Sequence, residues 1–246
     1  MCKFVRCFII IAFAIASLSG KAARLNDRIE NRPYADLRRW HLGFGVSTLF
    51  QDLSFSHSGF ITPGGEQWYM EQPSFSPGFG VNGLVDLRLH RHVNLRFAPG
   101  LLFGNRQIEM VNHGVPGSDA ATATSLSQNL KSTFIVLPFD VKLSSLRYRN
   151  SRPYLSLGVM PAIDVTRRRN DFLRLRPADC YLTVAIGCDF YLPFFKLIPE
   201  LKFCFGMTDV IDHDRPDLTD DPDKFKITQS LRRATSSMVI LTFYFE

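Results

Sequence analysis

The chain ends in Met238-Val-Ile-Leu-Thr-Phe-Tyr-Phe-Glu246, a run in which apolar side chains alternate with others. A period of two is typical of a β-strand that separates two environments. Aromatic residues near the end of such a strand are typical of outer-membrane β-barrels, whose aromatic girdles meet the lipid headgroups. We therefore expect Phe243 and Phe245 to face lipid, to close the barrel against its first strand, and to be recognised by the barrel-assembly machinery.

The start of the sequence has the features of a secretory signal peptide. Lys3 and Arg6 precede an apolar run at residues 8–16, and the small residues Ser17 and Ser19 follow it. The run is shorter than the ~20 residues that a transmembrane helix needs, so it indicates export. We expect a signal peptide at 1–22 that is cleaved near 19–22, a periplasmic segment at 23–40 and a barrel at 41–246.

Composition favours a single membrane domain. A length of 246 residues suits one barrel, and the formal charge of +6 is modest. The 22 phenylalanines are many for a soluble domain but normal where aromatic side chains meet headgroups. After removal of the signal peptide, Cys180, Cys188 and Cys204 remain, and this odd, sparse set predicts no disulfide scaffold.

Strand-like segments recur along the mature sequence, separated by clusters of glycine, proline, asparagine and aspartate. Tight connections at 90–92, 147–151 and 193–195 alternate with long ones, as in barrels with tight periplasmic turns and long external loops. We predict an all-β fold, an eight-stranded antiparallel up-and-down transmembrane β-barrel in the outer membrane, with both termini in the periplasm. The predicted strands cover residues 41–55, 75–90, 93–109, 132–146, 152–165, 179–192, 196–207 and 236–246.

Charged side chains of both signs recur on the polar faces of these strands. The lumen of an eight-stranded barrel is just wide enough for side chains, so charges there must pair or cost several kcal/mol each in desolvation. A soluble sandwich or lipocalin-like barrel would show the same alternation, but the aromatic last strand, the missing disulfides and the turn asymmetry favour the membrane barrel. The predicted lumenal charge network comprises Asp86, Arg88, Arg96, Asp140, Lys142, Asp189, Glu200 and Lys202.

Three further runs carry a family resemblance: Ser-Thr-Phe-Ile-Val-Leu-Pro-Phe-Asp-Val-Lys at 132–142, Arg-Pro-Tyr-Leu-Ser-Leu-Gly at 152–158, and Asp-Phe-Tyr-Leu-Pro-Phe-Phe-Lys-Leu-Ile-Pro-Glu-Leu-Lys-Phe at 189–203. With the closing Phe-Glu, they resemble the PorT family of outer-membrane β-barrels of Bacteroidota. The third run is the most specific. The resemblance implies an accessory role in type IX protein secretion, in the export and maturation of secreted cargo, and it implies no biochemical mechanism.

Two predicted external loops carry charge clusters. The loop at 166–178 contains five arginines, which could bind lipopolysaccharide phosphates or an acidic partner. Nucleic acid is a poor explanation, because stacking aromatics are not interleaved with the basic residues. In the loop at 208–235, aspartates surround His213; a rim-site hydrolase is an alternative there, although a solvated acidic loop explains the pattern. The five arginines are Arg167, Arg168, Arg169, Arg174 and Arg176.

The sequence predicts no enzymatic site, no cofactor and no metal. The histidines are scattered, and His90 with His92 would need further ligands to hold a metal ion. Gly-x-Ser-x-Gly, His-Glu-x-x-His and phosphate-loop patterns are missing from the sequence. We expect a non-enzymatic barrel whose partners are lipid, lipopolysaccharide and other type IX secretion components; a generic small barrel with a structural or adhesive role is the alternative.

Overall fold

The computed structural model describes residues 30–57, 68–71, 77–112, 125–166, 175–211 and 231–246. The predicted signal peptide lies outside these residues. The described part of the chain contains the 3-10 helix η1 and eleven strands. Their bounds are η1 Ala35–Leu37, β1 Trp40–His57, β2 Trp68–Glu71, β3 Pro77–Arg88, β4 Val93–Phe97, β5 Gly100–Asn112, β6 Ser125–Val136, β7 Phe139–Ser144, β8 Ser151–Asp164, β9 Ala178–Tyr191, β10 Lys196–Gly206 and β11 Leu231–Phe245.

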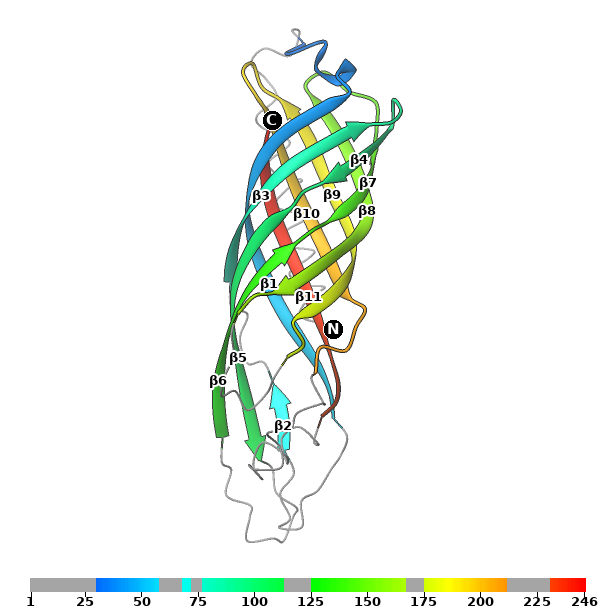
Figure 1. The fold of residues 1–246 in the computed structure, drawn as a ribbon. Helices are drawn as coiled ribbons and strands as arrows, with labels where there is room; N and C mark the ends of the chain where they lie inside the picture. Colours follow the sequence, from blue (N-terminus) through cyan, green and yellow to red (C-terminus); the bar gives the residue numbers. More distant parts are fainter. Residues whose placement is uncertain (1–29, 58–67, 72–76, 113–124, 167–174, 212–230) are drawn as a thin grey trace.

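The strands close into an antiparallel barrel (Figure 1). Strands that are consecutive in the wall pair with each other, and β11 returns to β1 to close the ring. The closing register places Phe44 of β1 opposite Phe245 of β11 and continues to Ser56 opposite Arg233. The predicted fold class, an all-β antiparallel up-and-down barrel, is confirmed.

Two of the eight predicted strands are interrupted at proline. The predicted strand 93–109 consists of β4 and β5, and 132–146 corresponds to β6 and β7. Pro99 and Pro138 lie in these gaps, and proline lacks the backbone N–H that a ladder requires. Their carbonyl oxygens still accept hydrogen bonds, that of Pro99 from the Gly83 N–H at 2.8 Å. If β4 with β5 and β6 with β7 are each counted as one wall strand, the described wall has eight strands. In addition, β2 pairs with β5, and the sequence pattern did not predict this strand.

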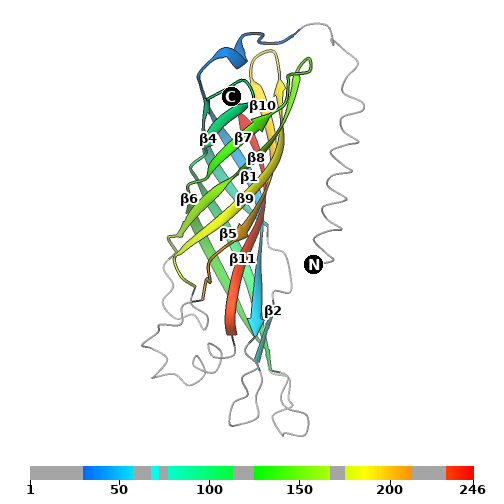
Figure 2. The same ribbon diagram turned by 90° about the vertical axis from the view of Figure 1, so that its right-hand side faces the viewer.

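The two ends of the barrel differ (Figures 1 and 2). At one end, here called the turn end, the short connections 89–92, 145–150 and 192–195 lie together with Glu246 and residues 31–39. At the other, the loop end, β1, β5, β6 and β11 extend beyond the remaining wall strands (Figure 1). The described strand ends that flank the tight predicted connections and those that flank the long ones thus lie at opposite ends of the barrel.

An apolar band surrounds the wall next to the turn end. On β1, the outward side chains are every second one from Leu42 to Phe50, and all of them except that of Thr48 are apolar. Further along the strand, the outward residues Asp52, Ser54 and Ser56 are polar. The distance along β1 from Trp40 to Phe50 is about 33 Å at 3.3 Å per residue, or roughly 25 Å of height once tilted by about 40°. That height matches the apolar belt of a membrane barrel. Among the described residues, no helix is long and apolar enough to cross a membrane.

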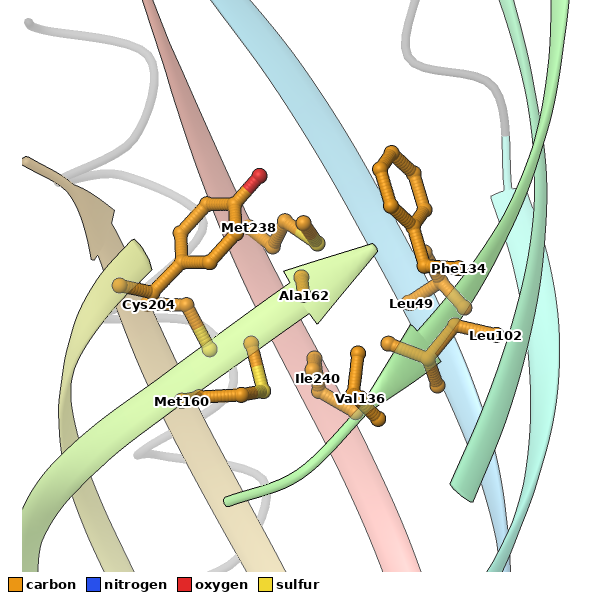
Figure 3. Close-up of a cluster of buried hydrophobic side chains, with 10 residues drawn as sticks. Leu49, Leu102, Phe134, Val136, Met160, Ala162, Cys204, Met238 and Ile240 are labelled. Carbon is orange, nitrogen blue, oxygen red and sulfur yellow. The ribbon is translucent and has the colours of Figure 1, made fainter. Parts of the chain in front are cut away.

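The inward side chains fill the lumen in layers. An apolar layer crosses its middle, where Leu49, Leu102, Met160 and Ile240 point into one space from different strands (Figure 3). Charged residues lie between this layer and the turn end. Along β10, for example, Glu200 and Lys202 precede Cys204, which belongs to the apolar layer.

Candidate functional site: a lumenal charge network

Arg96 stands at the centre of the buried charges. Its guanidinium projects inward from β4, and its side chain is 0% exposed. Nη2 lies 3.0 Å from Asp86 Oδ2 on β3, and Nη1 lies 2.5 Å from Glu200 Oε2 on β10. Arg96 thus bridges carboxylates from two strands on different sides of the lumen, and both are buried.

Two lysines extend the network from this centre. Lys142 Nζ lies 2.8 Å from Asp189 Oδ2 and 3.6 Å from Asp86 Oδ2. Lys202 Nζ lies 2.6 Å from Asp140 Oδ2, and also 3.4 Å from an oxygen of Glu200. Paired in this way, the buried charges avoid the cost of an isolated ion in a medium of low dielectric constant.

Tyrosine rings pack around Arg96. The ring centroids of Tyr154 and Tyr244 lie 5.0 Å and 5.5 Å from its Cζ atom, within the range of cation–π contacts. The Tyr154 hydroxyl donates a hydrogen bond to Glu200 Oε2 at 2.7 Å. Gly187 makes room for this ring, because a Cβ at that position would collide with the Tyr154 phenol.

Arg88 is not part of the network, which corrects the prediction. It occupies the last position of β3 at the turn end, where its Nη1 donates to the backbone oxygen of Asp36 at 2.5 Å, and its side chain is only half-buried. The sequence reasoning assigned it by the alternation of β3 alone, which does not say where the lumen ends. The structure places the other seven predicted charges in the lumen.

The network continues to the end of β11 through residues that the sequence reasoning missed. Glu246 Oε1 lies 2.6 Å from His41 Nδ1, and its Oε2 lies 2.8 Å from Lys196 Nζ. Lys196 also approaches Asp189 Oδ2, at 3.5 Å, and so joins this group to Lys142. His41 and Lys196 are the first residues of the predicted strands 41–55 and 196–207, so applying the alternation to these end positions would have found them.

Replacing Glu246 with glutamine should cost stability only where the carboxylate is ionised. Burial alone would raise the pKa of Glu246, but the hydrogen bond with His41 and the charge of Lys196 lower it from 4.5 to about 2. Stability from a lowered folded-state pKa is full above the unfolded pKa and is lost as the pH falls toward the folded one. The wild-type advantage of about 3 kcal/mol at pH 7 should therefore shrink between about pH 4.5 and pH 2 in urea unfolding. An advantage unchanged at pH 2 would contradict this.

Residues 31–39, here called the strap, lie across the turn end (Figure 1). The Asp36 carboxylate accepts a hydrogen bond from the Tyr191 hydroxyl at 2.5 Å and lies 3.5 Å from Arg152 Nη1. The Cζ atom of Arg147 lies 3.8 Å from the centroid of the Tyr191 ring, and its Nη2 donates a hydrogen bond to the backbone oxygen of Asn31 at 2.5 Å. The strap is thus fixed to the turns beside β8 and β9.

Replacing Asp36 with alanine should release the strap without unfolding the barrel. The change removes the acceptor for Tyr191 and one partner of Arg152, a loss of about 1–2 kcal/mol that is local to the strap. Amide hydrogen exchange at Ala35, Leu37 and Arg38 should accelerate about tenfold, because 1.4 kcal/mol corresponds to a factor of ten. Replacing Asp52, on the outer face of β1 toward the loop end, serves as the control. Unchanged exchange in the Asp36 variant would show that the contacts do not hold the strap.

The remaining predicted sites fall into two groups. Phe243 and Phe245 lie on the outer face of β11, where Phe245 stacks on Phe44 with centroids 5.4 Å apart. In the arginine loop, Arg176 is exposed, whereas the other four arginines, like His213, lie outside the described residues. Among the described residues there is no group of three or more side chains that could hold a metal ion.

Comparisons with known proteins give the family. The family described as Outer membrane protein beta-barrel domain matches residues 24–212. The crystal structure of the outer membrane protein OprG from Pseudomonas aeruginosa is 11% identical, with a TM-score of 0.49 over 84% of this chain and 93% of that chain. The crystal structure of Neisserial surface protein A (NspA) is also 11% identical, with a TM-score of 0.41 over 84% and 98%. No curated protein matches the chain. Because the family match spans more than half of the sequence, this chain belongs to the outer membrane protein beta-barrel domain family.

Proposed function

We propose that this outer-membrane barrel is a non-enzymatic accessory of type IX protein secretion that supports the export and maturation of secreted cargo. The observation that carries the proposal is the location of its most PorT-like run, residues 189–203. This run supplies four members of the lumenal network: Asp189, Lys196, Glu200 and Lys202. The segment that carries the resemblance therefore also fills the lumen, which favours a barrel that acts through its ends.

The two ends would meet different partners. In the proposed orientation the turn end is periplasmic, so the strap and the short turns contact other secretion components. The long loops face outward, where Arg176 and its neighbouring arginines contact lipopolysaccharide phosphates. Phe243 and Phe245 are recognised by the barrel-assembly machinery during insertion. No nucleic acid and no cofactor enter this proposal.

The decisive experiment is deletion of the gene, followed by an assay of cargo secretion and rescue with the full chain. Secretion should fall and should return with the wild-type chain. The Asp36→Ala variant should insert normally and rescue less well, because it changes the surface offered to the machinery. Secretion that is normal after deletion would remove the proposed function and leave a structural or adhesive barrel.

Conductance offers an independent test of whether the barrel acts as a pore. Charged side chains and the apolar layer occupy the lumen of the described barrel, and an eight-stranded barrel has little further space. We therefore expect no large, stable openings in planar bilayer recordings. Such openings would favour a channel function over an accessory one.

A further inference from the structure

Basic residues lie directly beyond the apolar band at the turn end. Trp40, 59% exposed, begins β1 and is preceded by Arg38 and Arg39. In the β3–β4 turn, Arg91 lies between the apolar residues Leu89 and Val93. At the turn end, basic residues thus follow the apolar residues of the band within one or two positions along the chain.

Hydrogen bonds join these residues into one continuous surface. The Arg88 N–H donates to the Arg39 oxygen at 2.9 Å, which connects the strap to the β3–β4 turn. Arg152 Nη2 donates to the Arg91 oxygen at 2.5 Å and so brings the start of β8 to the same turn. We call the exposed residues of this surface the basic edge: Arg38, Arg39, His90, Arg91 and Arg149.

Two carboxylates at the turn end, those of Asp36 and Glu246, are engaged with other residues. Asp36 accepts from Tyr191 and approaches Arg152, while Glu246 is paired with His41 and Lys196. The β9–β10 turn on the other side of the opening is apolar, and its Phe194 is 92% exposed. The exposed cations of the basic edge lie beside β1, β3, β4 and β8.

The depth of the basic edge matches the headgroup layer of a bilayer. A typical bilayer has a hydrocarbon core of about 30 Å within a total of about 40–45 Å, which leaves some 5–8 Å for headgroups on each side. Two residues beyond the band correspond to about 6.6 Å of extended chain. Tyr148, which is 69% exposed, lies next to Arg149. Tyrosine and tryptophan side chains such as those of Tyr148 and Trp40 favour the headgroup layer, because one end of each is apolar and the other is polar.

We propose that the basic edge binds the phosphate groups of anionic glycerophospholipids in the leaflet at the turn end. Arginine suits this role because its guanidinium matches phosphate in shape and charge. An acidic protein partner would be met beyond the headgroup layer, whereas these cations border the apolar band itself. The strap contributes by fixing Asp36 to the barrel, which holds the following Arg38 and Arg39 next to the membrane surface. The inference rests on membership of the outer-membrane barrel family and is independent of the proposed role in secretion.

The test uses the full mature chain in nanodiscs of phosphatidylcholine with a minority of phosphatidylglycerol. The lipids retained by the released barrel are counted by native mass spectrometry. One variant replaces Arg38, Arg39, Arg91 and Arg149 with glutamine. The matched control replaces four cations toward the loop end with glutamine: Lys131, Arg176, Arg232 and Arg233.

Wild type and the loop-end control should enrich phosphatidylglycerol about threefold over its share of the nanodisc, and the turn-end variant should lose this enrichment. Raising the salt concentration should weaken the enrichment, since screening acts on exposed charges. Equal enrichment in wild type and the turn-end variant would overturn the proposal, and would leave an acidic protein as the partner to seek. Equal loss in both variants would also overturn it, by showing an effect of net charge alone.

Discussion

Replacing Arg96 with leucine should destabilise the barrel by about 3–5 kcal/mol, the range measured when one partner of a buried ion pair is removed. The variant leaves Asp86 and Glu200 with one cationic partner each, Lys142 at 3.6 Å and Lys202 at 3.4 Å. It also removes the cation that lies against the rings of Tyr154 and Tyr244. Urea unfolding in lipid vesicles, followed by tryptophan fluorescence, measures the change. The heat-modifiable shift on gels reports the folded fraction.

Two controls separate the loss of pairing from the loss of a side chain. Arg88→Leu removes the same residue type from the neighbouring strand, where the guanidinium donates to the backbone oxygen of Asp36 at the turn end; the expected cost is about 1 kcal/mol. Combining Arg96→Leu with Asp86→Asn and Glu200→Gln removes the stranded charges and should recover part of the stability. Equal urea midpoints for Arg96→Leu and Arg88→Leu would show that the network does not contribute as argued.

The period-two pattern was sufficient to predict the wall of the barrel and its inward positions. Side chains of a strand alternate strictly between two faces, so the positions of Asp140 and Lys142 follow once the apolar face of β7 is known. The same rule misassigned Arg88, since alternation does not state at which residue the lumen ends. Pro99 and Pro138 can be read from the sequence. Whether a strand is interrupted at a proline depends on its hydrogen bonds with the neighbouring strand, which the sequence does not give.

Contacts between distant segments were beyond sequence reasoning. The strap depends on Asp36 meeting Tyr191, and a lone aspartate before a strand does not indicate a partner 155 residues later. The link from His41 to Glu246 likewise spans nearly the whole chain and exists only because β11 closes on β1. Such pairs become predictable only after the closing register is known, because that register brings the two ends of the barrel sequence together.

Removing Phe245 and Glu246 should prevent most of the chain from reaching the folded state. The deletion removes the stack of Phe245 on Phe44 and the carboxylate that joins His41 to Lys196. It also removes the backbone hydrogen bonds between Glu246 and Lys196, at 2.8 Å and 3.0 Å, which close the end of the β10–β11 ladder. The combined loss is about 3 kcal/mol or more. The heat-modifiable fraction in the outer membrane should fall at least about tenfold, which requires only about 1.4 kcal/mol.

The way in which the truncated chain fails distinguishes weak closure from failed recognition by the assembly machinery. Glu246→Gln loses the ion pairs with His41 and Lys196 but keeps the Phe245 stack and the backbone bonds, so its folded fraction should fall less than that of the truncated chain, and it serves as the matched control. If closure is the cause, the truncated chain should also refold poorly from urea into vesicles that contain no assembly machinery. Normal refolding there, together with poor assembly in cells, would place the defect in recognition of Phe245 instead. Normal assembly in cells would contradict both explanations, because the closing pair of strands would then tolerate the loss of its last contacts at the turn end.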